Sequence, residues 1–175
     1  MEQFERATLL DPGYTDAWVG LGETWVLLPV WELDYDKAAE QIEKGQQAVE
    51  TALRLNPESG RAHYVLAYRH LLRLEWNECF KNFERAVELE PEHATAWQWY
   101  AGALSNVGRK EEARAAFETA LKLDPRSRII GTGMTEYFQS IGDYDAALDR
   151  IDKTLDFAPD FLFGHQVKEI GRAHV

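Results

Sequence analysis

The sequence has little of several features that mark common classes of protein. It has one cysteine, Cys79, in 175 residues, so an internal disulfide is excluded and a packed, reduced thiol is expected. Basic residues are also scarce, because 19 Lys and Arg stand against 30 Asp and Glu and give a net charge of −11. Phosphate groups are bound by clustered cations, so nucleic acids and anionic membrane surfaces are both disfavoured as partners.

Neither a membrane span nor a leader segment is expected from the sequence. Met1 leads directly into residues that read as the second helix of a repeat, so neither a signal peptide nor membrane insertion is expected. The expected location is cytoplasmic, or periplasmic if the chain belongs to a membrane-anchored parent.

Proline occurs only six times, and four of the six stand at intervals of 34 residues: Pro57, Pro91, Pro125 and Pro159. A small residue usually lies five positions before each of them: Ala52, Ala86 and Ala120, with Thr154 as the exception. A bulky apolar residue lies eight positions before: Val49, Phe83, Phe117 and Ile151. Proline ends a helix, and small residues let two helices approach closely. Each period therefore predicts a pair of helices of about twelve to fourteen residues.

The segment from Trp97 to Pro125 resembles a tetratricopeptide repeat. Seven residues stand in the register of that repeat: Trp97, Ala101, Gly108, Ala113, Phe117, Ala120 and Pro125. Residues 60–93 and 128–161 fit more loosely, with departures at His63, His70, Leu74 and Gly131. The resemblance implies an all-α protein, a right-handed α-solenoid of antiparallel helix pairs. It also implies a non-catalytic scaffold for protein–protein interaction, without cofactors.

The register of the prolines predicts one array over residues 1–175. It consists of a half repeat (second helix only) at 1–12, repeats at 15–57, 60–91, 94–125 and 128–159, and a half repeat (first helix only) at 162–175. The 15–57 repeat has eleven surplus residues around 27–33. We expect Pro29 to end its first helix and residues 35–55 to form one long second helix. A linker about two residues longer than standard is expected before the last helix, which would group Val167, Ile170, Gly171 and His174 on one face.

The insertion and the residues that follow from Trp76 are also similar to the repeat modules of bacterial adenylate or guanylate cyclases and of winged-helix regulators. This second resemblance implies an alternative function, a regulatory or sensory segment of a larger signalling protein. The partner would then be the parent's own output domain in place of a separate protein or peptide. Because the chain opens and closes on half repeats, self-association through their apolar faces is a further hypothesis.

No group of residues predicts catalysis or a metal site. His63 and His70 lie on one helical face with His93 nearby in sequence, but the first two fill positions where repeats of this type carry packing aromatics. The Gly131-Thr132-Gly133 segment lacks the preceding strand and the lysine of a phosphate loop. Catalytic residues, metal ligands and cofactors are therefore all expected to be absent.

The predicted binding surface is the concave face that the first helices line in this type of array. Its positions fall seven, eleven and fourteen residues past each proline: Val19, Glu23, Val26, Tyr64, Tyr68, Leu71, Gln98, Gly102, Ser105, Thr132, Glu136 and Gln139. The predicted peptide-binding residues are Tyr64, Tyr68, Leu71, Gln98, Trp99, Ser105 and Asn106, because aromatics beside hydrogen-bonding groups are typical of binding hot spots. Alternatively, Tyr64 and Trp99 pack between repeats. A clamp for C-terminal carboxylates is not expected. Such a clamp needs several Lys, Arg and Asn residues on neighbouring first helices, and these positions offer mainly Arg61 and Asn106.

Overall fold

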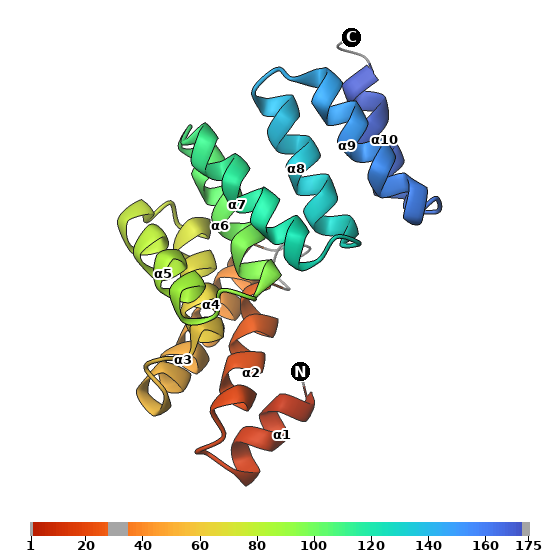
Figure 1. The fold of residues 1–175 in the computed structure, drawn as a ribbon. Coiled ribbons are helices and arrows are strands. Elements are labelled where there is room, and N and C mark those ends of the chain that lie inside the picture. The colour runs from red at the N-terminus through yellow and green to blue at the C-terminus, as the bar shows by residue number, and fades with distance from the viewer. Residues whose placement is uncertain (1, 28–34, 173–175) are drawn as a thin grey trace. The chain divides into compact units, whose positions relative to one another are not determined.

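The computed structural model describes residues 2–27 and 35–172, which form helices joined by short turns (Figure 1). Ten α-helices lie in this part of the chain: α1 (Glu2–Leu10), α2 (Thr15–Leu27), α3 (Tyr35–Leu55), α4 (Gly60–Leu72), α5 (Trp76–Leu89), α6 (Ala94–Asn106), α7 (Lys110–Leu123), α8 (Arg128–Ser140), α9 (Tyr144–Phe157) and α10 (Leu162–Arg172). The long second helix expected over 35–55 is α3. The expected helix end at Pro29, the insertion at 28–33 and His174 lie outside the described residues.

The helices form two compact units, residues 1–91 and 92–175. In the first unit α2 packs against α3 and α4 against α5, and in the second α6 packs against α7 and α8 against α9. First helices also contact the next first helix, as α2 with α4, α6 with α8 and α8 with α10. The fold class is therefore the expected all-α arrangement of stacked helix pairs. The division of the chain into one continuous array of named repeats stays a prediction.

Small residues bring the paired backbones into contact, as the periodicity predicts. A Cβ atom added to Gly45 of α3 would lie 3.0 Å from the carbonyl oxygen of Gly22 on α2. Cys79 and Ala113 are fully buried at the corresponding places in α5 and α7. These contacts fix the register of each pair, because a larger side chain would push the helices apart.

The linker before α10 has the standard length, so the longer linker expected from the sequence is wrong. α10 begins at Leu162, three residues past Pro159, as α6 begins three residues past Pro91. The turn is closed in the same way as earlier ones, because the amide of Phe161 donates to the carbonyl of Ala158 as Ser127 does to Asp124. In this register Val167 and Gly171 are buried, whereas Ile170 is 57% exposed.

A ring nitrogen at the fourth residue of a first helix repeatedly meets the carbonyl oxygen of the preceding proline. Nε1 of Trp18 donates to the Pro12 carbonyl at 2.9 Å. Nε2 of His63 lies 3.1 Å from the Pro57 carbonyl and that of His165 lies 2.8 Å from the Pro159 carbonyl. Tryptophan and histidine share a ring N–H, so His63 replaces an aromatic residue without loss of this bond.

Within the described residues, no helix combines the length and apolar character that a bilayer crossing requires.

Candidate binding faces on the first helices

The predicted binding residues fall on two surfaces, one in each unit. We call these the α2–α4 face, in residues 1–91, and the α6–α8–α10 face, in residues 92–175. Each is named for first helices of its unit that contact one another.

The α2–α4 face consists of a charged pair above two packed tyrosines. Tyr64 and Tyr68 are only 1% and 4% exposed, and desolvation raises the pKa of both phenols. The Tyr64 hydroxyl donates to a carboxylate oxygen of Glu23 at 3.5 Å, and Glu23 forms an ion pair with Arg61. Leu71 is half-buried one turn further along α4. The groups that solvent meets here are chiefly those of Glu23 and Arg61, and the binding role of Tyr64, Tyr68 and Leu71 stays a prediction.

The α6–α8–α10 face has a different character, because α6 has no charged residue and α8 has only two, Arg128 and Glu136. Helix α6 has the sequence ATAWQWYAGALSN and contains no Asp, Glu, Lys, Arg or His. Gln98, Trp99 and Ser105 are half-buried on it, and Asn106 is exposed at its last residue. These four predicted residues therefore share one helix, and their binding role is likewise a prediction.

Gly102 and Glu136 also belong to the α6–α8–α10 face. The sequence placed both on the concave face, but it did not include them among the predicted binding residues. A Cβ atom added to Gly102 would meet no atom within 4 Å, so this part of α6 is open. Glu136 of α8 stands one repeat further, and desolvation raises the pKa of its carboxyl group. The composition of the two helices could have identified these residues. Gly102 is a glycine in the interior of α6, and Glu136 is the one carboxylate of α8.

Apolar side chains are exposed around the same face. Ile129 at the start of α8 is 55% exposed, and Phe163 and Ile170 of α10 are 49% and 57% exposed. Gln139 of α8 donates from Nε2 to the Val167 carbonyl at 3.0 Å, which ties α8 to α10. The face thus offers apolar contact, amide groups and one carboxylate.

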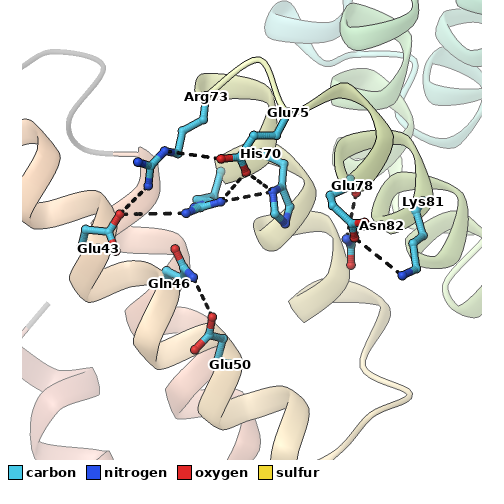
Figure 2. A network of polar contacts seen from close by, with 10 residues as sticks. Glu43, Gln46, Glu50, His70, Arg73, Glu75, Glu78, Lys81 and Asn82 are labelled. Atoms are coloured by element: carbon cyan, nitrogen blue, oxygen red, sulfur yellow. Dashed lines mark hydrogen bonds and ion pairs between the residues drawn. The ribbon is translucent and has the colours of Figure 1, made fainter.

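A polar network joins α3 to the turn between α4 and α5 (Figure 2). The side chain of Arg69 is 9% exposed and its Nη1 lies 2.6 Å from Glu75. Arg73 binds Glu43 of α3 at 2.7 Å, and Nδ1 of His70 binds Glu75 at 2.6 Å. The hydrogen bond from His70 and the charge of Arg69 hold the pKa of Glu75 below its ordinary value. All these charged groups are used in holding helices together.

The same network surrounds a strained turn. Leu74, which the sequence places where a turn glycine is usual, has a φ of 57°. Gly108 and Gly142 adopt this left-handed conformation at the matching turns, with φ of 77° and 80°. A leucine here costs energy that a glycine does not, and the anchored Glu75 next to it helps to hold the turn.

His63, His70 and Cys79 are also occupied by structural contacts. Nδ1 of His63 lies 2.9 Å from Oδ1 of Asn82, and His70 contacts Glu75. In the part of the chain that the structure describes, no three His, Cys, Asp or Glu residues are grouped as metal ligands. Cys79 is fully buried, and burial raises the pKa of its thiol to about 12. A thiol of that pKa is a poor nucleophile at neutral pH.

Comparison with known proteins identifies the repeats. Residues 76–132 match the model of the family described as tetratricopeptide repeat. Protein O-mannosyl-transferase TMTC1 of Mus musculus is 30% identical over 116 residues, which are 64% of this chain and 11% of that protein. Superkiller protein 3 of Saccharomyces cerevisiae is 28% identical over 153 residues, 85% of this chain and 10% of that protein. Anaphase-promoting complex subunit 3 of Schizosaccharomyces pombe is 22% identical over 107 residues, 61% of this chain and 16% of that protein.

Solved structures agree in fold. A thermophilic tetratricopeptide-repeat protein of Thermus thermophilus has a TM-score of 0.80 at 20% identity, over 97% of this chain and 87% of that one. YrrB, described as a tetratricopeptide-repeat protein with an unusual peptide-binding site, has a TM-score of 0.67 at 23% identity, over 95% of this chain and 80% of that one.

The stacked helix pairs place the chain among the helical-repeat proteins, a class of scaffolds for protein–protein interaction. The family match over residues 76–132, with the shared fold elsewhere, confirms the resemblance seen in the sequence: this is a tetratricopeptide-repeat protein. It spans only about a tenth to a sixth of the length of the curated relatives named above.

Proposed function

We propose that the chain is a non-catalytic scaffold that binds a protein segment on the faces of its first helices. The observation that supports this most directly is the contrast between the two helices of one pair. Helix α6 carries no charged residue, whereas its partner α7, with the sequence KEEARAAFETALKL, is charged along its exposed side. An uncharged surface with exposed apolar side chains around it favours contact with another protein.

The predicted residues contribute unequally to this proposal. Gln98, Trp99, Ser105 and Asn106 would contact the segment directly from α6. Tyr64 and Tyr68 would act from below, because they are buried and support the Glu23–Arg61 pair that meets solvent. Leu71 would contribute apolar contact at the edge of the α2–α4 face.

A second form of this function places the partner in the same polypeptide. Two of the matched relatives are much longer than this chain. The segments that align with it make up only 16% and 10% of their lengths, so these relatives are about six and ten times longer than the aligned segments. In a parent of that size the faces could hold a regulatory or output domain, as in the signalling proteins that the insertion resembles. The binding surface would be the same in both forms.

Peptide selection followed by NMR tests the proposal. The chain would be used to select binders from a displayed library of random twelve-residue peptides, and an enriched peptide would be titrated into the isotope-labelled protein. We expect amide shifts to change on α6 and α8, with Gln98 and Gly102 among the most affected, or on α2 and α4. Failure to enrich any peptide, or shifts confined to α7 and α9, would contradict a first-helix binding face.

A further inference from the structure

Gly102 lies in the middle of α6 without a packing reason. Glycine is the least favourable residue inside a helix apart from proline. Other helical glycines are explained by contact: an added Cβ would lie 3.1 Å from Phe117 at Gly133 and 2.8 Å from Phe161 at Gly164. At Gly102 it would meet nothing within 4 Å. The glycine therefore leaves space above α6 that the fold does not need.

Glu136 occupies the equivalent position on α8. This helix is the first of the next helix pair, and it contacts α6. Helix α8 has one other charged residue, Arg128, and its guanidinium lies over the Phe161 ring at 5.1 Å from the centroid. Among the described residues no cation offsets the desolvation that raises the pKa of Glu136, although its side chain remains accessible to solvent. A carboxylate in this setting is a strong partner for a cationic group that reaches it.

The surroundings define the rest of the ligand. Ile129, Phe163 and Ile170 are exposed apolar groups, and Gln98 and Ser105 can hydrogen-bond to a backbone. A run of several charges would find no counterparts on α6, because that helix has none. The complementary ligand is therefore mostly uncharged and carries a single positive charge.

Building on the proposed function, we propose that the α6–α8–α10 face selects an extended protein segment with one lysine or arginine among uncharged residues. The cationic group lies over Gly102 and pairs with Glu136. Apolar side chains of the segment contact the exposed groups on α8 and α10.

The test uses the full chain and the random twelve-residue library, with four variants selected in parallel. Glu136→Gln removes the proposed charge, and Glu111→Gln removes an equal charge from α7 as the matched control. Gly102→Leu fills the open space, and Gly102→Ala controls for the change in helix propensity. Circular dichroism verifies that each variant keeps its helicity.

We expect peptides selected on the native chain to carry a single Lys or Arg at one position. Their affinity should fall by about tenfold with Glu136→Gln, which is near the lower end of the range for close charge pairs at interfaces because Glu136 keeps some contact with solvent. It should fall at least as far with Gly102→Leu and change little with Glu111→Gln and Gly102→Ala. Affinity for the native chain should also decrease with added salt.

Other outcomes overturn the inference in distinguishable ways. Enriched peptides without a basic residue, or equal losses in Glu136→Gln and Glu111→Gln, would refute the charge selection while the proposed function stands. Enrichment of peptides that resemble this chain's own α1 or α10 would assign the face to a second copy instead. No enrichment on any variant would refute both the inference and the proposed function.

Discussion

Gly131 of α8 and Thr154 of α9 depart from the repeat pattern at the same contact. A large residue is usual at the first position and alanine occupies the second in the other full repeats. A Cβ atom on Gly131 would overlap Oγ1 of Thr154, and this oxygen is already bonded to the Arg150 carbonyl at 3.2 Å. The two departures compensate one another, because the space that Gly131 leaves is filled by Thr154.

This compensation predicts a sign change in a double-mutant cycle. Gly131→Ala should lower the free energy of unfolding by about 1–2 kcal/mol, since the overlap outweighs the gain in helix propensity. In a Thr154→Ala background the same change should raise it by up to about 1 kcal/mol. Urea denaturation of the four proteins measures both effects. Additive effects would mean that Thr154 does not determine the need for glycine.

Cys79 gives a prediction on pH. Its thiol has a folded-state pKa of about 12, whereas an unfolded cysteine ionises near pH 8.5. The stability that comes from the neutral, buried thiol is complete below pH 8.5 and is lost as pH rises towards 12, because only the unfolded state releases the proton. At pH 9.5 the loss should be about 1.4 kcal/mol relative to pH 7.

Cys79→Ala isolates that contribution, since alanine stands at the matching places in α7 and α9, where Ala113 and Ala147 are fully buried. The difference in stability between the native chain and the variant should shift in favour of the variant by the same amount from pH 7 to pH 9.5. A difference that stays constant with pH would show that the folded thiol ionises normally.

At the scale of helices, the sequence predicted most of what the structure contains. The period of 34 residues determines where helices start, because each proline is followed by a turn of constant length. The same argument gave residue 162 as the start of the last half repeat, and α10 begins at Leu162. The longer linker was inferred from apolar spacing alone, and this spacing is ambiguous in a helix whose side chains Leu162, Phe163 and Ile170 are exposed.

Side-chain partners were less predictable than helices. The burial of Tyr64 and the Glu23–Arg61 pair join residues about forty positions apart, and periodicity specifies helix faces without specifying which polar groups meet. The positions of Gly102 and Glu136 on the outward side did follow from the register. Their significance depends on open space and on missing cations, and neither is visible in a single sequence.

At the scale of the whole molecule, the contacts that support each helix come from its neighbours within a unit. Helix α7 packs on α6 and α8, and α4 packs on α2, α3 and α5. Stability in such a protein is approximately a sum of repeat and neighbour terms, so local damage should remain local. The two units, residues 1–91 and 92–175, offer a natural place to observe this.

Ala120→Leu provides the measurement. Ala120 is fully buried in α7, so a leucine there should overpack the contact with α6 and lower stability by about 1–3 kcal/mol. Native-state hydrogen exchange should show faster amide exchange in α6, α7 and α8, with little change in α2 and α4. Arg114→Leu is the control on the same helix, because Arg114 is exposed and its ion pair with Glu118, at 3.0 Å, lies within α7. It should alter exchange slightly and only in α7. Equal acceleration in α2 and α4 would show that the chain unfolds as one cooperative block and that neighbour coupling does not describe it.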